Sequence, residues 1–322
     1  MLSALVWLRM GYRASTLRDR PFTFMRILVT GHLGYIGSVL TQALIQKGHA
    51  VTGMDRRSES GCAAPLPTLE GDIRDIAPDA LRGFEAVIHL AALPADSEDQ
   101  LDPQTSLEVN HLAAARLAVL AKVAGVGRFL FASASPEQRG GASGYPMREQ
   151  RPRTPVPFDV AKGRAEIDLA RLNSEEFRVV TLRLPSVYGR SPRMRADLVL
   201  HALVDEAQSQ GSLGFNANAN DLNQPIHIND VVRGFEQALV LPVEELTHAV
   251  YDLGASIAPV ERSELLRMVA ERVDGAVVHV IPSIPPAVVP QPRAPRPQAQ
   301  GLPGFEAEIS LDQGLEGLLS LE

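Results

Sequence analysis

The chain has 322 residues, with 31 basic and 38 acidic side chains and a formal charge of −7. That length is enough for roughly two domains, and 45% hydrophobic with 21% charged residues is ordinary globular composition. The acidic balance lacks the basic surplus that neutralises phosphates, so we expect no nucleic-acid partner. No apolar run approaches the roughly 20 residues of a membrane-spanning helix, so we expect no membrane partner. A single cysteine, Cys62, cannot form an internal disulfide, which fits a reducing compartment or a chain that needs no disulfide, and we expect a cytoplasmic protein.

The first 24 residues differ in charge from the rest. They hold four arginines and one aspartate, so the body of the chain from Met25 onward is more acidic than the whole. Arginine with few acids is typical of a transit peptide, but a disordered basic arm, or a start assigned upstream of the native one, explains this segment better.

From Met25 the chain alternates short β-rich runs with segments of helical periodicity, which predicts a parallel sheet covered by helices. After about residue 185 this alternation loosens. Residues 282–297 contain seven prolines, too many for a helix or a central strand, and we expect an extended connector there. The predicted strands are 26–30, 50–54, 86–90, 128–132 and 178–184; the predicted helices are 36–46, 104–124, 159–172, 198–208, 230–241 and 310–319.

A glycine-rich turn, residues 30–37, directly follows the first predicted strand and opens the first predicted helix. Gly31, Gly34 and Gly37 permit a tight turn and close backbone approach, and the helix N-terminus presents free N–H groups to a pyrophosphate. An ordinary glycine-rich strand–helix turn is the alternative, but this placement favours a dinucleotide site.

The second predicted strand ends at Asp55, where a carboxylate accepts hydrogen bonds from the adenosine ribose of NAD. Arg56 and Arg57 follow and could meet the 2′-phosphate of NADP. The residues therefore predict NAD as the cofactor and leave NADP open. No group of histidine, cysteine and acidic residues has metal-ligand spacing, so we expect no metal.

Six further segments carry short patterns beyond the glycine turn. They are residues 71–75 (GDIRD), residues 87–92 (VIHLAA), Asn110, residues 182–189 (LRLPSVYG), residues 226–231 (IHINDV) and residues 304–315. Together with the G-x-x-G-x-x-G spacing, they resemble the extended short-chain dehydrogenase/reductase family, the NAD-dependent epimerases and dehydratases of nucleotide sugars. The resemblance implies an α/β fold, with a Rossmann-like doubly wound parallel sheet in residues 25–185. It also implies a smaller, mixed C-terminal substrate-binding region in residues 186–322, some segments of which return to the sheet.

By this resemblance Asp72 and Ile73 lie at the adenine, residues 90–92 lie along the middle of the cofactor, and Asn110 is an amide on the cofactor side. The alternatives are a buried strand end for residues 89–92 and a solvent-facing Asn110. The residues assigned to the cofactor are Gly31, Gly34, Tyr35, Ile36, Gly37, Asp55, Asp72, Ile73, Leu90, Ala91, Ala92, Asn110, Lys162 and Pro185.

Members of that family carry a Tyr-x-x-x-Lys pair on a helix, with a serine or threonine at the end of the preceding strand. The phenol moves the proton of a substrate hydroxyl while hydride passes to or from the nicotinamide. Here Lys162, one of only three lysines, matches the lysine, but Phe158 occupies the tyrosine position. Lys162 is therefore also a candidate catalytic residue, but Phe158, in place of its usual tyrosine partner, cannot exchange a proton.

The hydroxyl partner is altered as well. The family position falls on Ala134, and the candidates are its neighbours Ser133 and Ser135, the latter through a one-residue shift in register. Tyr145, in the loop before the helix, is a further candidate for proton transfer. Other residues that could line the pocket are Asp159, Tyr188 and His201.

Three functions remain open at this stage. The first is an epimerase, dehydratase or oxidoreductase that acts on a nucleotide sugar, or a similar hydroxyl or keto substrate, with an atypical proton-transfer group. The second is a cofactor-binding regulatory or scaffold protein without turnover, and the third is a non-redox lyase or cyclase that reuses the pocket. The resemblance also implies a homodimer, for which the apolar helix within residues 112–123 is a candidate face.

Overall fold

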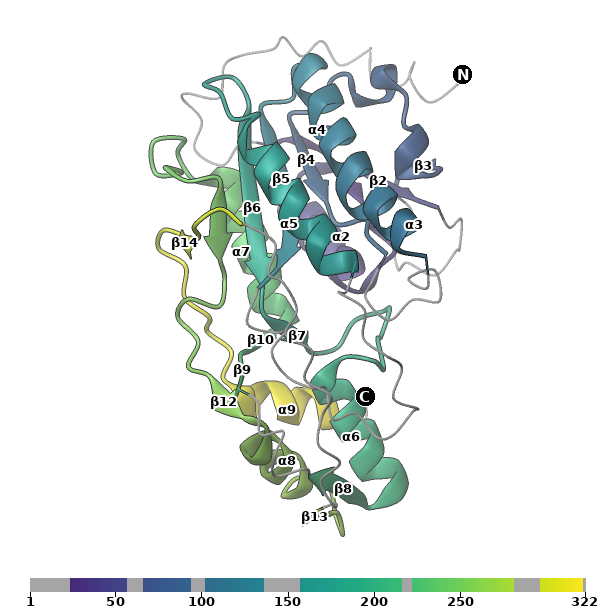
Figure 1. Cartoon of the computed structure of the whole chain (residues 1–322), viewed down its shortest axis with the longest axis vertical. Coiled ribbons are helices and arrows are strands. Elements are labelled where there is room, and N and C mark those ends of the chain that lie inside the picture. Colours follow the sequence, from purple (N-terminus) through teal and green to yellow (C-terminus); the bar gives the residue numbers. More distant parts are fainter. Residues whose placement is uncertain are drawn as a thin grey trace.

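An eight-stranded parallel sheet forms the centre of the fold (Figure 1). The chain starts in the middle at β1, builds β2 and β3 toward one edge, and then returns to the other side of β1 with β4. This reversal is the topological switch point at which α/β sheets bind ligands, at the carboxyl ends of the strands. The strands in sheet order are β14 (Gln300–Gly301), β11 (Val250–Asp252), β6 (Arg178–Leu184), β5 (Arg128–Ala134), β4 (Ala86–His89), β1 (Arg26–Thr30), β2 (Ala50–Asp55) and β3 (Thr68–Glu70).

The computed structural model describes most of the chain, but several predictions fall outside the described residues. These predictions concern the basic arm, Cys62, Tyr145 and most of the proline-rich connector. Among the described residues, no helix is long and apolar enough to cross a membrane, and no group of three or more His, Cys, Asp or Glu side chains could hold a metal ion. The described residues are 24–56, 66–93, 102–135, 157–215, 222–280 and 296–320.

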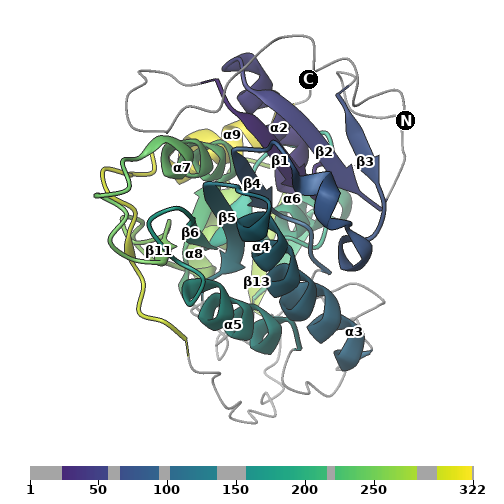
Figure 2. The ribbon, with the colours of Figure 1, turned by 90° about the horizontal axis from the view of Figure 1, so that it is seen from above.

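Helices cover both faces of the sheet, as Figure 2 shows. One face carries α2 and α7, and the other carries α3, α4 and α5. The predicted helix at 104–124 is divided, because a π-helical segment, Glu108–Ala113, separates α3 from α4. The bounds are α2 (Tyr35–Gln46), α3 (Pro103–Leu107), α4 (Ala114–Val123), α5 (Pro157–Ala170) and α7 (Ile228–Val240), with short 3₁₀ turns η3 (Ile73–Asp75) and η4 (Pro78–Leu81).

The central strands are buried on both sides, which explains their nearly continuous apolar sequences. Along β1, Ile27 and Val29 pack into the core under α2 and α7, whereas Leu28 between them packs into the core under α4 and α5. This alternation follows from the two-residue period of a strand.

The chain after residue 185 divides its segments between the sheet and a smaller unit, seen at the bottom of Figure 1. The strands β11 and β14 return to the main sheet, while the smaller unit has its own apolar core around Tyr188. Its elements are β7 (Ser186–Tyr188), α6 (Val199–Gln210), β8 (Ser212–Phe215), β9 (Leu222–Asn223), β10 (Pro225–His227), β12 (Val260–Glu261), α8 (Arg262–Ala270), β13 (Val277–Val280) and α9 (Leu311–Leu319).

Candidate functional site

The glycine turn joins β1 to α2 in the conformation that close approach demands. Gly31 has a φ of +71°, and a Cβ there would lie 2.7 Å from the backbone nitrogen of Ala91. A Cβ on Gly37 would lie 2.1 Å from the carbonyl oxygen of Gly31. Both positions therefore need glycine if the turn is to pack against the loop after β4 and against α2.

The first turn of α2 has the features of an anion site. Its cap residue, Gly34, supplies no side-chain hydrogen bond to the helix, and the first turn contains no acidic residue. The leading N–H groups of a 12-residue helix and the positive end of its dipole thus face the space beside the turn. This arrangement fits the pyrophosphate of a dinucleotide.

Asp55 lies at the end of β2, against the same turn. Its Oδ2 accepts a hydrogen bond from the backbone nitrogen of Leu33 at 3.2 Å, and the residue is half-buried. The carboxylate is thus held beside the glycine turn, and its predicted contact with the adenosine ribose remains a prediction. Arg56 follows it and is largely exposed, and its guanidinium lies 3.9 Å from Asp72.

Asp72 is tied to its own turn. Its Oδ1 caps η3 by accepting the backbone N–H of Arg74 at 2.9 Å, and the Arg74 guanidinium donates to both carboxylate oxygens. The hydrogen bonds from the Arg74 side chain are the largest cause that lowers the pKa of Asp72. Ile73 next to it is buried. Asp72 is therefore a paired carboxylate, and its predicted contact with adenine remains a prediction.

Asn110 lies in the π-helical segment and is buried. Its Oδ1 accepts from the backbone nitrogen of Leu93 at 2.9 Å, and its Nδ2 donates to the Leu93 oxygen at 3.0 Å and to Ser106 Oγ at 3.1 Å. The amide thereby holds the chain that leaves residues 90–92. Sequence reasoning missed this backbone role, and it excludes a solvent-facing Asn110.

Lys162 lies on α5 in a desolvated position. Its side chain is 3% exposed, its Nζ donates to the Ala132 oxygen at 2.9 Å, and it lies 4.4 Å from the centre of the Phe131 ring. The ring of Phe158, one helical turn earlier, lies 5.6 Å from the same Nζ. Burial lowers the pKa of Lys162 from 10.5 to about 7. The amine can therefore both bind and release a proton near neutral pH.

A buried histidine borders this lysine. His89 at the end of β4 shares a hydrogen bond with Thr30 Oγ1 at 2.7 Å and stacks on Phe131 with ring centres 5.7 Å apart. Burial lowers its pKa to about 3, and the charge of Lys162 adds to this effect. The His89 imidazole is thus uncharged near neutral pH and lies beside the candidate site.

The serine candidates near the end of β5 both donate to buried or half-buried carboxylates. Ser133 Oγ donates to Glu166 at 2.6 Å, and Ser135 Oγ donates to Asp252 at 3.2 Å. Ala134, which the sequence predicts at the family's hydroxyl position, is half-buried between them. Their proposed catalytic roles remain predictions, since each hydroxyl would have to leave a carboxylate to meet a substrate.

Two further residues have structural partners. His201 accepts the Gly189 N–H at Nε2, 3.1 Å away, and bonds the Arg195 oxygen through Nδ1 at 2.7 Å. Pro185, which follows β6, is buried and packs against Gly254. A Cβ added to Gly254 would lie 3.1 Å from the proline ring. Neither arrangement leaves an obvious group for proton transfer.

A cavity of about 440 Å³ lies between α2 and α7, apart from the residues described above. None of the predicted cofactor or catalytic residues lines it. Its lining residues are Ser38, Val39, Gln42, Ala43, Gln46, Arg190, Pro192, Asn229, Val232, Arg233 and Glu236.

Comparison with known proteins agrees with this geometry. The sequence profile described as the NAD dependent epimerase/dehydratase family matches residues 27–254, and the chain belongs to this family. A UDP-glucose 4-epimerase of Mycolicibacterium smegmatis is 30% identical over 229 residues, which are 66% of this chain and 73% of that one. Membership confirms the predicted family and the predicted cofactor, NAD.

Solved structures extend the comparison to nearly the whole chain. MoeE5 in complex with UDP-glucuronic acid and NAD is 28% identical, covers 91% of this chain and 97% of its own, and has a TM-score of 0.69. The UDP-glucose 4-epimerase of Thermotoga maritima with UDP-glucose, at 22% identity, covers 91% and 97% with a TM-score of 0.68 and supports the fold alone. The predicted Rossmann-like fold is confirmed.

Proposed function

We propose that this chain is an NAD-dependent enzyme that acts on a hydroxyl or keto carbon of a nucleotide sugar, in the manner of an epimerase or dehydratase. The names of its relatives support this substrate class, since they include a UDP-glucose 4-epimerase and a protein solved with UDP-glucuronic acid. The observation that carries the proposal is Lys162, a buried amine with a pKa near 7 on the helix that bears the family's catalytic pair.

The chain's own residues supply the binding half of the reaction. NAD, when bound, accepts and returns a hydride. The N–H groups of the glycine turn and α2 bind its pyrophosphate, and Asp55 binds the adenosine ribose. The exposed Arg56 beside Asp55 leaves NADP as an alternative cofactor.

Lys162 takes the proton-transfer role that the family gives to tyrosine. Phe158 has no proton to exchange, and no hydroxyl stands at Ala134. A neutral amine at Lys162 accepts the proton of a substrate hydroxyl, and the ammonium returns it to a keto oxygen. The carbonyl oxygen of Ala132 accepts one Nζ hydrogen and so holds the amine at β5 during this exchange.

A second function is favoured by a specific observation. The hydroxyls of Ser133 and Ser135 both donate hydrogen bonds to carboxylates, and Phe158 lacks the hydroxyl of a tyrosine. A cofactor-binding regulatory or scaffold protein without turnover has no use for those groups. Activity measurements distinguish this alternative from the enzyme.

The test is turnover by purified protein supplied with NAD⁺ and a panel of UDP-hexoses, UDP-uronic acids and UDP-N-acetylhexosamines. Products are followed by mass spectrometry and bound reduced nicotinamide by absorbance. We expect Phe158→Tyr to raise the rate by about 10-fold or more, because a positioned acid–base group is worth about 10²–10⁴-fold. Phe84→Tyr, at another half-buried phenylalanine, is the matched control. Absence of turnover in both wild type and Phe158→Tyr, with NAD bound, would contradict the enzymatic proposal and favour the second function.

We also propose a homodimer through the outer face of α4 and the segment before it. Leu112, Val119 and Val123 are 50%, 45% and 80% exposed and lie at helical spacing, whereas Leu117 is fully buried against the sheet. Light scattering is expected to show a dimer that Val119→Glu converts to monomer. A wild-type monomer at micromolar concentration would contradict the proposal.

A further inference from the structure

A buried charged cluster joins the ends of β5, β6 and α5 to the C-terminal segment. Glu166, on α5, is fully buried and accepts hydrogen bonds from three side chains. Ser133 donates at 2.6 Å, Arg183 donates through Nη2 at 2.7 Å and Nε at 3.1 Å, and Arg296 donates at 2.9 Å. A carboxylate removed from water needs such partners, because an unpaired buried charge is strongly destabilising.

Arg296 does more than neutralise Glu166. Its Nη1 also donates to the carbonyl oxygen of Ala134 at 2.9 Å, and its Nη2 donates to that of Asp159 at 3.0 Å. Ala134 holds the family's hydroxyl position, and Asp159 directly follows Phe158 in the first turn of α5. The guanidinium, with its side chain 8% exposed, therefore bridges the two backbone segments on which the family carries its catalytic hydroxyls.

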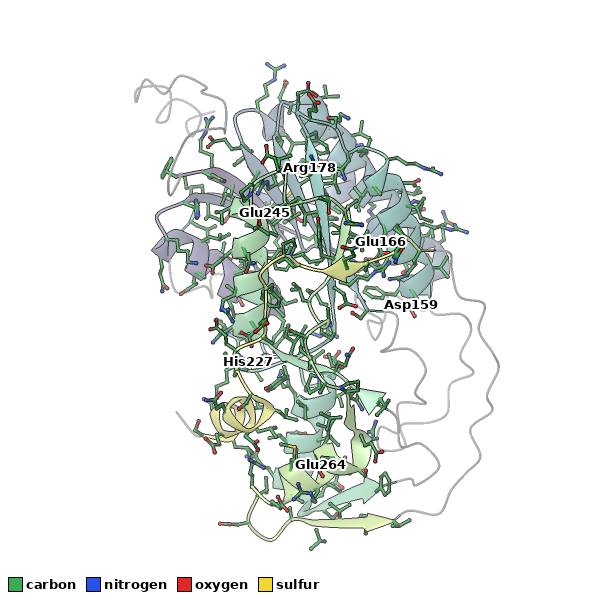
Figure 3. All side chains as sticks on the ribbon, turned by 90° about the vertical axis from the view of Figure 1, so that its left-hand side faces the viewer. Asp159, Glu166, Arg178, His227, Glu245 and Glu264 are labelled. Carbon is green, nitrogen blue, oxygen red and sulfur yellow. The ribbon has the colours of Figure 1, made fainter. Side chains whose placement is uncertain are left out.

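The segment that carries Arg296 is anchored at the same place. Arg183 donates to the carbonyl oxygen of Pro297 at 2.8 Å, and β14 then adds to the edge of the sheet beside β11. In Figure 3, Glu166 and Asp159 lie beside the yellow C-terminal segment. The proposed catalytic centre is thus completed by the last residues of the proline-rich stretch.

The cluster also surrounds Lys162 with charge. Glu166 lies one turn further along α5 and raises the pKa of Lys162, whereas Arg296 lowers it. His89, from β4, is neutral at physiological pH, since its own pKa lies at about 3. Arg183, from β6, is paired with Glu166. Burial is the main cause of the low pKa of Lys162; of the two charges that also change it, Glu166 opposes this lowering and Arg296 adds to it.

We propose that Arg296 is a positioning residue of the catalytic centre, which fixes the end of β5 against the start of α5 and acts through its charge on the protonation of Lys162. Its importance for catalysis rests on the proposed function, but its action on Lys162 does not. A cation placed here keeps the amine available as a proton acceptor near neutral pH. A loose C-terminal segment would therefore alter both the geometry and the charge of the site.

The chain's low lysine content allows a direct test. With only Lys47, Lys122 and Lys162 present, isotopically labelled lysine gives three side-chain NMR signals in the unliganded, full-length protein. Lys162→Arg assigns the signal of interest, and the two remaining lysines serve as internal references. The titration midpoint is measured in wild type, Arg296→Gln, Arg296→Lys and Arg171→Gln, where Arg171 is an exposed arginine directly after the end of α5.

Arg296→Gln is expected to move the Lys162 midpoint upward by on the order of one unit, since a unit charge within about 10 Å at an effective dielectric near 20 has about that effect. Arg296→Lys keeps the charge and is expected to leave the midpoint near the wild-type value, as is Arg171→Gln. A folded Arg296→Gln with an unmoved midpoint would overturn the proposal. If Arg296→Gln does not fold, a midpoint in Arg296→Lys that rises by a unit would overturn it equally. Neither outcome depends on NAD or on turnover, so failure of the proposed function remains a separate result.

Discussion

Replacing Lys162 with methionine tests the buried amine through protein stability. The pKa of Lys162 is lowered from 10.5 to about 7 in the folded chain, mainly by burial. Between those values the unfolded chain binds a proton that the folded chain does not, so the free energy of unfolding rises with pH across this window. At about 1.4 kcal/mol per unit, the full penalty is about 5 kcal/mol, present below about pH 7 and absent above about pH 10.5.

Methionine removes this penalty together with the hydrogen bond to Ala132 and the contact with Phe131, which are worth about 1–2 kcal/mol each. The pH dependence is therefore a cleaner measure than the absolute difference. Between about pH 6 and about pH 9, the wild type should gain about 2.5 kcal/mol relative to Lys162→Met.

The assay is urea unfolding followed by circular dichroism at several pH values, with Lys122→Met, which removes an exposed lysine from α4, as the control. Parallel stability curves for the wild type and Lys162→Met across this pH range would refute a desolvated lysine at this site.

Three further predictions follow from the same geometry. Gly31→Ala forces a Cβ toward the backbone of Ala91 at a φ of +71°. It should lower the melting temperature and weaken NAD binding, measured by calorimetry, at least about 10-fold. Unchanged affinity would show that the turn does not approach the cofactor. Because the pKa of His89 lies at about 3 instead of 6.5, the wild type should lose about 2 kcal/mol of unfolding free energy between about pH 7 and about pH 5. His89→Gln should abolish this loss. An equal acid sensitivity in the variant would contradict the buried, neutral state of His89. Gly314→Ala should destabilise the smaller unit, since a Cβ there would lie 2.2 Å from the Tyr188 hydroxyl, and an unchanged melting temperature would argue against that contact.

The sequence predicted the central sheet well because its strands are buried on both faces. The strands β1 and β6 begin and end at the predicted residues, since each is an apolar run bounded by polar residues or turns. In contrast, β11 and β14 contain three and two residues, which is too short for any periodicity to show. Both strands join the sheet after the chain has passed through segments of the smaller unit, so their place depends on pairing with strands that are distant in sequence.

The candidate site divides along the same line. The glycine turn and Lys162 follow from local spacing, because a helix places residues four apart on one face. Glu166 and Arg296 are 130 residues apart, and a charged residue on a helix is usually a solvated one. Their pairing depends on how the C-terminal segment returns to the sheet. The π-helical segment that contains Asn110 could not be predicted either, because hydrophobic periodicity does not distinguish a π-helix from an α-helix.

The proposed enzyme depends on NAD bound at the turn from β1 into α2. The most direct measurement is titration of purified, full-length protein with NAD⁺ and NADP⁺ by calorimetry, together with mass spectrometry of any dinucleotide released on denaturation. We predict that NAD(H) is released from the protein or binds in the micromolar range or tighter, and more tightly than NADP⁺. Protein that releases no dinucleotide and binds neither cofactor at millimolar concentration would show that this turn is not an NAD site.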